Sequence, residues 1–187
     1  MKTVSKKLML NQLINISWTL LAFTPILIYW SGQHFYTTIY IYLAISAIFG
    51  LVPKHIFERL QLSYKPEFYE RLGVKKIRHF VQDGDIINRS IRKDLPHHRI
   101  IRDRSSLVKY LKTVEMYERY HFICLIFFLL ISVHAFGNSR YTVSIIITTC
   151  NFLYNVCPIL LQQFNKARVL NLSRNNENLN SGKSKLP

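Results

Sequence analysis

Two residues at the start of an apolar stretch have the types and the spacing for proton transfer. Glu118 and His121 are three residues apart, so they lie on one side of a helix. A carboxylate that hydrogen-bonds an imidazole fixes its tautomer and raises its basicity, which a general base requires. The same two residues are also typical of a polar pair that ends a membrane helix. Spacing alone leaves both interpretations open.

A second histidine offers an alternative base. His98 precedes Asp103 by five residues, the spacing in which glycerolipid acyltransferases use a histidine to take a hydroxyl proton and an aspartate to orient it. The glycine-rich phosphate-binding block of those enzymes is missing from this sequence. The Asp-Gly-Asp at 83–85 predicts a turn, because it lacks the other ligands of a calcium loop. Asp83 is kept as a candidate substrate-binding residue.

A polar stripe follows the last apolar stretch. Buried amides in membrane helices normally face protein, because unpaired ones are costly in lipid. The stripe therefore predicts either a lining for the hydroxyl or phosphate groups of a substrate, or contacts that only hold helices together. Pro158 removes one helix hydrogen bond within the stripe and leaves a carbonyl free nearby. The members of the stripe are Asn155, Gln162, Asn165 and Arg168.

Four apolar segments without Lys, Arg, Asp or Glu must position these residues. A bilayer core needs about 20 apolar residues per helix, and a backbone in lipid must satisfy its own hydrogen bonds, which favours helices. The sequence predicts an all-α integral membrane protein with two helical hairpins. Its three cysteines lie inside these segments and predict neither a disulfide nor a metal site. The four expected spans are residues 13–30, 35–52, 120–136 and 141–161.

The charge distribution predicts how the spans are oriented. The chain has 25 Lys+Arg and 10 Asp+Glu, and cytoplasmic termini would leave Arg140 as the single basic residue outside. Residues 54–119 are expected to form a basic amphipathic segment on the inner membrane face. Residues 1–170 then form one membrane domain, and residues 171–187 are expected to be a disordered tail. Since topology explains the charge, no nucleic acid partner is expected.

Four stretches resemble the glycosyl-4,4′-diaponeurosporenoate acyltransferase family of small bacterial membrane proteins. They are residues 67–76 with the turn at 83–84, then His98, then Glu118-x-x-His121, and finally residues 155–168. The last stretch, NVCPILLQQFNKAR, is similar to the family pattern NVYPxxLQRYNRxR. The resemblance covers about residues 65–170. The chain departs from the family at Gln82, Val114, Met116, Phe122, Gln163 and Lys166.

The resemblance implies an acyltransferase in the bacterial cytoplasmic membrane. It would move a fatty acyl group from acyl-CoA or acyl carrier protein to a hydroxyl of a lipid-soluble glycosylated acceptor, at the cytoplasmic face. His121 would be the general base oriented by Glu118, with His98 as the alternative base. No metal or prosthetic cofactor is implied, since the acyl thioester is a co-substrate. Asn155 and Gln162 would line the cavity, and Asn165 and Arg168 would hold a polar or anionic headgroup.

The competing hypothesis is a non-enzymatic subunit or assembly factor of a larger membrane protein complex. The departures from the family at 114–116 and at Gln163 favour it, because the missing Arg at 163 weakens an inherited anion-binding role. A transporter fits less well, because no charged residue lies at the middle of any expected span.

Overall fold

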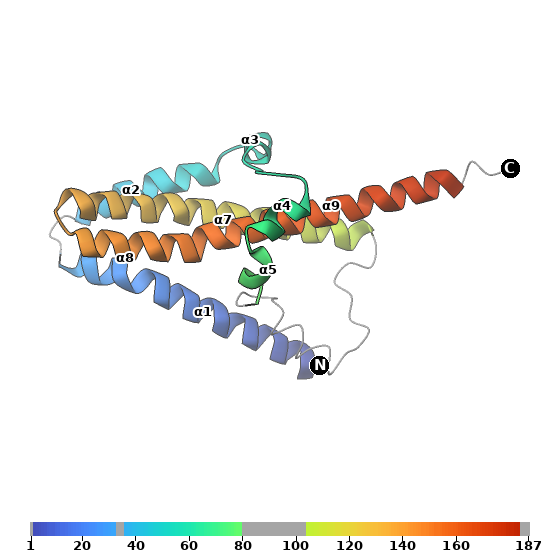
Figure 1. Ribbon diagram of the computed structural model, residues 1–187. Helices are drawn as coiled ribbons and strands as arrows, with labels where there is room; N and C mark the ends of the chain where they lie inside the picture. Colours follow the sequence, from blue (N-terminus) through green and yellow to red (C-terminus); the bar gives the residue numbers. More distant parts are fainter. Residues whose placement is uncertain (1, 33–35, 80–103, 184–187) are drawn as a thin grey trace.

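The computed structural model of the protein is a bundle of long helices with three short helices at one side (Figure 1). It describes residues 2–32, 36–79 and 104–183, and this part of the chain contains helices and no strands. In chain order the elements are α1 (Lys2–Ser31), α2 (Tyr36–Gly50), α3 (Lys54–Arg59), α4 (Pro66–Arg71), α5 (Val74–Ile77), α7 (Arg104–Gly137), α8 (Tyr141–Asn151), the π-helical segment η1 (Phe152–Val156) and α9 (Cys157–Lys183).

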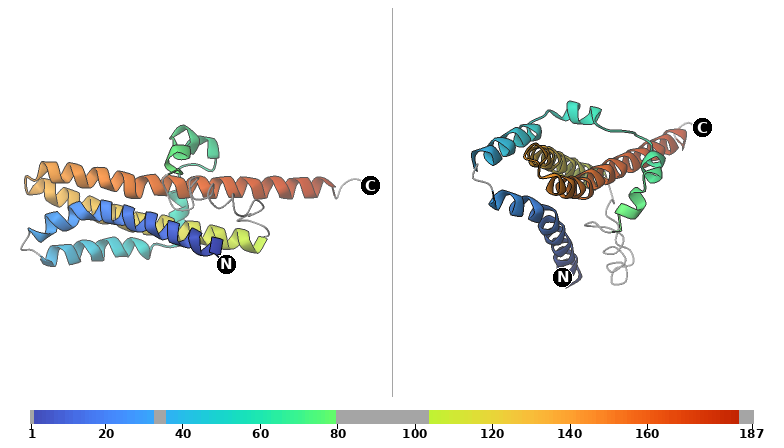
Figure 2. Two further views of the ribbon diagram at one scale, coloured as in Figure 1. Left: turned by 90° about the horizontal axis from the view of Figure 1, so that it is seen from below. Right: turned by 60° about the vertical axis from the view of Figure 1, so that its left-hand side comes forward.

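The helix α7 is the centre of the bundle. Both α2 and α8 pack along it, α9 packs on it beyond η1, and α1 packs mainly on α8 (Figure 2). Helices α7 and α8 run side by side and are joined by a tight turn in which Ser139 has a φ of 60°. The main partner of α2 is α7, and the main partner of α1 is α8.

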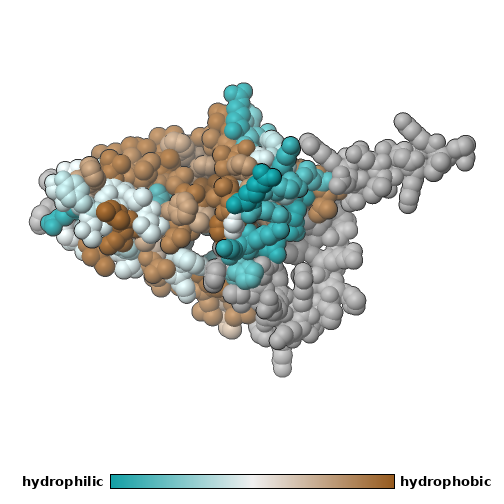
Figure 3. All heavy atoms as spheres, viewed as in Figure 1, coloured by the Kyte–Doolittle hydropathy of each residue, from teal (hydrophilic) through white to brown (hydrophobic). Residues whose placement is uncertain are grey.

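Within the described residues, three helices are long and apolar enough to cross a membrane. These stretches are Leu8–Ser31, Ser105–Gly137 and Tyr141–Ser173. The fourth expected span corresponds to α2, whose apolar part, Thr37–Gly50, is shorter than the roughly 20 residues of a full span. Many large apolar side chains of the bundle face outward, and hydrophobic residues cover most of its visible surface (Figure 3).

The two ends of the bundle carry different groups. At one end, called the turn end here, α1 stops and α7 meets α8; at the other, the termini end, the chain begins and α9 leaves (Figure 1). Arg140 precedes α8 at the turn end, whereas Lys75 belongs to α5, which lies away from that end (Figure 1). The hydrophilic surface gathers around α4 and α5 (Figure 3). The short helices therefore lie away from the turn end.

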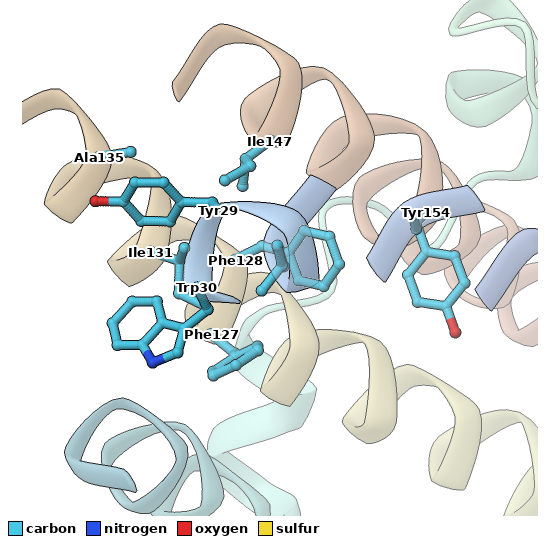
Figure 4. Packing of buried hydrophobic residues seen from close by; sticks show 10 residues of the cluster. Tyr29, Trp30, Phe127, Phe128, Ile131, Ala135, Ile147 and Tyr154 are labelled. Atoms are coloured by element: carbon cyan, nitrogen blue, oxygen red, sulfur yellow. The ribbon is translucent and has the colours of Figure 1, made fainter. Parts of the chain in front are cut away.

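Two clusters of buried residues hold the fold together. The larger one packs aromatic rings of α1, α7 and η1, with Phe128 fully buried between them (Figure 4). The smaller one fixes α4 and α5 on α9 through Tyr69, Val74 and Phe164. Burial of a large apolar side chain contributes about 1.5–3 kcal/mol, so the second cluster suffices to dock these short helices.

The end of the chain differs from the expected disordered tail. The helix α9 continues through residue 171 to Lys183. Extending a packed helix adds one hydrogen bond per residue without a new nucleation step, and no proline interrupts residues 171–183. A polar composition therefore did not end the helix.

Candidate active site

One bilayer thickness, counted from the turn end along each chain path, ends near the polar residues of α7 and of α9. Twenty helical residues rise about 30 Å, the thickness of a bilayer core. Counted from Gly137 at the turn end, this distance along α7 ends near Glu118. Counted from Tyr141 along α8 and η1, it ends near Leu161. A hydrogen bond of 2.9 Å from Gln163 Nε2 to Glu118 Oε1 joins the two helices at that height.

A proline shapes the first part of the site. Pro158 has no N–H to donate to the carbonyl of Tyr154, four residues earlier. The chain widens into the π-helical segment η1 just before this proline, and such segments recur at functional sites. Asn151 and Asn155 are 6% and 0% exposed at the two ends of this wide turn. Both amides point inside the bundle, where they need partners.

The two amides form an oriented chain that ends on His121. Asn151 Nδ2 donates to the carbonyl of Leu125 on α7 at 3.1 Å, and a carbonyl accepts only, so the other end of the Asn151 amide is oxygen. That oxygen accepts from Asn155 Nδ2 at 2.8 Å. The Asn155 oxygen therefore faces His121, with 3.4 Å between Oδ1 and Nδ1. The network fixes both amide orientations.

This orientation decides which ring nitrogen of His121 is basic. The oxygen of Asn155 is an acceptor, so Nδ1 of His121 must carry the hydrogen. In the neutral ring, Nε2 then holds the lone pair. The rings of Tyr120 and Tyr154 flank the imidazole, with centroids 5.2 and 5.7 Å away. Such an imidazole can take a proton from a hydroxyl group brought to Nε2.

Glu118 does not orient His121, which corrects the expectation from their spacing. The Glu118 side chain is 2% exposed and its carboxylate accepts from Gln163 on α9, whereas His121 faces η1. Residues three apart on a helix point about 60° away from each other around its axis. That angle is enough for Glu118 and His121 to meet different neighbouring helices.

Gln163 joins the membrane helices to the chain between α3 and α4. Its Nε2 also donates to the carbonyl of Leu60 at 3.0 Å, and its Oε1 accepts from the backbone N–H of Leu62 and from the Tyr69 hydroxyl, both at 3.2 Å. Gln61 Nε2 donates to the same hydroxyl at 2.8 Å. Burial raises the pKa of Tyr69 above its usual value, which keeps this hydroxyl a donor.

A second set of contacts fixes the end of α2. Arg119 donates to the carbonyls of Gly50 at 3.1 Å and Val52 at 2.6 Å, and its guanidinium lies 4.5 Å from the centre of the Phe57 ring. A cation at the carboxyl end of a helix is favourable, because that end carries partial negative charge. The two helices approach closely here, since a Cβ at Gly50 would lie 2.9 Å from Ile123 Cδ1 and this side chain would have to move.

A small pocket lies beside Glu118, between α3, α7 and α9. It has about 10 Å³ of free space, room for about one water molecule. Lys54 on its rim pairs with Glu115 at 2.8 Å, and this hydrogen bond raises the pKa of Lys54. Within the described residues, no group of three His, Cys, Asp or Glu could hold a metal ion. The pocket is lined by Lys54, Phe57, Glu58, Glu115, Glu118, Arg119 and Lys166.

The structure separates the expected site residues into three groups. His121 and Asn155 come together, and Glu118 belongs to the neighbouring Gln163 contacts. His98 and Asp83 lie outside the described residues. The remaining candidates, Gln162, Asn165 and Arg168, follow one another along α9. None of them makes a side-chain hydrogen bond to another described residue. Gln162 and Asn165 are partly buried, and Arg168 is exposed.

Sequence reasoning missed several residues that the structure puts at this site. Asn151 precedes Asn155 by four residues, so helical spacing was a signal that could have found it. Gln163 was noted only as a departure from a family pattern. No local sequence pattern predicts its contacts with Leu60 and Leu62, which lie about 100 residues away in the sequence. The remaining ones are Gln61, Tyr69, Tyr120 and Tyr154.

Comparisons with known proteins agree with the resemblance seen in the sequence. The family model described as glycosyl-4,4′-diaponeurosporenoate acyltransferase matches residues 53–175. This range is about two thirds of the chain and runs from just before α3 into α9, so it contains His121, Asn155 and Gln163. No curated protein and no solved structure matches the chain. Since the match covers more than half of its length, the chain belongs to the glycosyl-4,4′-diaponeurosporenoate acyltransferase family.

Proposed function

We propose that the protein is a membrane-bound acyltransferase that moves a fatty acyl group from an acyl thioester to a hydroxyl of a lipid-soluble glycosylated acceptor. Membership of the family supports this class of reaction. The observation that carries the proposal is the oriented chain from Leu125 through Asn151 and Asn155 to His121. It leaves a histidine with a basic Nε2 where the membrane core is expected to end.

The proposed reaction needs one base and no covalent enzyme intermediate. His121 Nε2 takes the proton of the acceptor hydroxyl while the hydroxyl oxygen bonds to the thioester carbon. The tetrahedral intermediate then breaks its carbon–sulfur bond, and the leaving thiolate receives the proton from the imidazolium. Asn155 keeps the imidazole in one tautomer throughout. The products are an ester and a free thiol, and the base is regenerated.

The proposed topology puts this chemistry at the cytoplasmic face. In this arrangement residues 35–52, which include α2, form a fourth short span, and both termini lie in the cytoplasm with Arg140 outside. The acyl donor is acyl-CoA or acyl carrier protein, which are cytoplasmic, and the acceptor lies in the bilayer. The site belongs where the two phases meet. The membrane is the bacterial cytoplasmic membrane.

The remaining candidate residues take supporting roles in the proposal. Asn165 and Arg168 follow the site along α9 toward the termini end, where a polar or anionic headgroup would lie. Gln162 would line the acceptor path. Glu118 supports the base only through the packing of α7 on α9. His98 is the alternative base, and Asp83 an additional substrate contact.

The test is an acyl-transfer assay on the full-length protein in lipid nanodiscs. Radiolabelled palmitoyl-CoA is the donor, and glycosyl-4,4′-diaponeurosporenoate or an extract of bacterial glycolipids is the acceptor. We expect His121→Gln to lower the rate by about 10²–10⁴-fold, the usual contribution of a general base. His134→Gln is the matched control, because His134 lies on the same helix with a side-chain hydrogen bond but at the turn end.

Three outcomes would change the proposal. A loss of activity in His98→Gln with normal activity in His121→Gln would move the base to His98. Normal transfer in both variants would remove histidine base catalysis. If no acylated product forms with either acceptor while the protein copurifies at fixed stoichiometry with a larger membrane protein, the non-enzymatic subunit hypothesis would be favoured instead.

A further inference from the structure

We propose that Tyr120 is a second catalytic residue, whose hydroxyl donates a hydrogen bond to the thioester carbonyl oxygen as that oxygen becomes negative. The inference rests on the proposed function and adds the oxyanion donor that the reaction requires. It starts from a row of hydroxyl groups that crosses three elements at the height of His121. General-base catalysis at His121 makes no use of this row.

The row consists of three hydroxyls in contact. Thr19 Oγ1 of α1 lies 2.9 Å from Tyr154 Oη of η1, and Tyr154 Oη lies 3.2 Å from Tyr120 Oη of α7. Figure 4 shows the Tyr154 hydroxyl pointing away from the other side chains of the aromatic cluster. Buried hydroxyls at membrane depth need such partners, because lipid offers none.

Counting hydrogens shows that one donor is left over. Three hydroxyls bring three hydrogens, and their two contacts use two of them. The third hydrogen stays on Thr19, Tyr154 or Tyr120, according to which hydroxyl donates in each contact. Three other threonines of the described chain donate to the carbonyl four residues earlier on their own helix, whereas the Thr19 hydroxyl contacts Tyr154. A row that runs from Thr19 to Tyr154 to Tyr120 leaves the free hydrogen on Tyr120.

Tyr120 is the accessible end of the row. Its side chain is 43% exposed, whereas Tyr154 is 8% exposed. Among the described residues, its other partner is the thiol of Cys124, one turn along α7, and a thiol is a weak partner that a carbonyl oxygen can displace. In the proposal, this end of the row receives the acyl carbonyl.

The position of Tyr120 next to His121 suits a reaction that needs both a base for the acceptor hydroxyl and a donor for the thioester carbonyl. The rings of Tyr120 and His121 have centroids 5.2 Å apart, and the proposal places the thioester carbonyl at the Tyr120 hydroxyl and the acceptor hydroxyl at His121 Nε2. When the acceptor oxygen bonds to that carbon, the electron pair of the C=O bond moves onto oxygen, which Tyr120 stabilises. The pair returns as the carbon–sulfur bond breaks, and Tyr120 keeps its own proton.

The row also strengthens the donor. A hydroxyl that accepts a hydrogen bond becomes a better donor, because each bond polarises the next. Thr19 and Tyr154 are thus positioning residues that act through Tyr120. Their loss is expected to cost less than the loss of Tyr120 itself, since the terminal hydroxyl would remain.

The experiment measures both the rate and the bound carbonyl. Palmitoyl-CoA with a ¹³C-labelled carbonyl is bound to the full-length protein in nanodiscs without acceptor, and its carbonyl stretch is recorded by infrared spectroscopy. We expect a shift to lower frequency in the wild-type protein and none in Tyr120→Phe. In the transfer assay we expect Tyr120→Phe to lower kcat by about 10²–10³-fold, the usual cost of losing one oxyanion donor, and Thr19→Val to lower it by up to about 10-fold.

The matched control is Tyr29→Phe, which removes a buried hydroxyl from α1 at the turn end; both its rate and its carbonyl frequency should match those of the wild type. A normal rate in Tyr120→Phe, together with an inactive His121→Gln, would overturn this inference and leave the proposed function standing. A carbonyl shift retained in Tyr120→Phe would also overturn it. Normal transfer in both variants would instead contradict the proposed function.

Discussion

The helix α7 carries one histidine near each end of its apolar part, and the two have different partners. At the turn end, His134 is surrounded by the rings of Tyr29, Trp30 and Tyr42, with centroids 5.3–5.9 Å away. Its Nδ1 lies 2.9 Å from the Tyr29 hydroxyl. The amide nitrogen of Asn138, a donor, lies 3.4 Å from both of its ring nitrogens.

His121 has the opposite kind of partner. The amide of Asn155 presents its oxygen to Nδ1, because the rest of the amide chain fixes its orientation. A hydrogen-bond donor next to a ring nitrogen occupies the lone pair of that nitrogen. An acceptor instead binds the hydrogen of that nitrogen, so the lone pair is on the other ring nitrogen. The comparison teaches that the type of partner, rather than burial, makes one histidine a structural element and the other a candidate base.

The largest effect on stability is expected at the termini end. Gln163→Leu removes the donor to Glu118 and to the Leu60 carbonyl and the acceptor for Leu62. Leaving a buried carboxylate and backbone groups unpaired should lower the free energy of unfolding by about 3 kcal/mol. Thermal unfolding in detergent measures this loss.

The control for Gln163→Leu is the adjacent amide. Gln162 is partly buried and makes no side-chain hydrogen bond to another described residue, so Gln162→Leu should change stability by less than about 0.5 kcal/mol. Equal losses in the two variants would show that the Gln163 contacts do not hold the α3–α4 segment on α9.

The next effect tests the two histidines directly through their amide partners. Asn155→Leu removes the acceptor that fixes the His121 tautomer, and the transfer rate should fall by about 10–100-fold, or about 1.4–2.7 kcal/mol of transition-state stabilisation. Asn138→Leu makes the same change beside His134 and should leave the rate unchanged. Acyl transfer in nanodiscs measures both, and equal rates in the two variants would remove the distinction between the histidines.

A smaller effect is expected from the hydroxyl contacts of the turn end. Ser132 Oγ lies 3.0 Å from Ser144 Oγ and 2.6 Å from Thr148 Oγ1, which joins α7 to α8. Ser144→Ala should cost about 1 kcal/mol, as a single hydrogen bond between membrane helices does. Unfolding in detergent should detect this, while acyl transfer stays normal. A rate loss comparable to that of Asn155→Leu would show that the turn end takes part in catalysis.

The smallest effect concerns alkaline pH and the Tyr69 hydroxyl. Burial raises its pKa above 10.0, the value of an exposed tyrosine. A raised pKa in the folded state means that stability is fully present below pH 10 and declines as pH rises above it. Limited proteolysis between α3 and α4 should therefore accelerate above pH 10 in the wild type. Tyr69→Phe should lose this dependence, and an unchanged profile would contradict the role of the hydroxyl.

The sequence determined the class of the protein because long apolar segments can satisfy their backbone only as helices in a membrane. It also determined where the charge lies along the chain, since Arg140 precedes α8 at the turn end and Lys75 belongs to α5, away from that end. His121 and Asn155 were both named as candidates from the sequence, but their contact was not, and the structure shows it. The spacing of three residues suggested that Glu118 would contact His121. The two side chains point about 60° apart around the α7 axis, and Glu118 contacts Gln163 instead.

Only the tertiary structure could decide contacts that join distant parts of the chain. Gln163 meets Leu62 and Glu118 across about 101 and 45 residues, and no local pattern encodes such distances. The orientation of the Asn155 amide depends on Asn151 and on a carbonyl of α7, so the basic nitrogen of His121 follows from packing. Composition and periodicity fix which solvent each segment prefers, whereas the partner of each buried polar atom depends on how the helices are packed together.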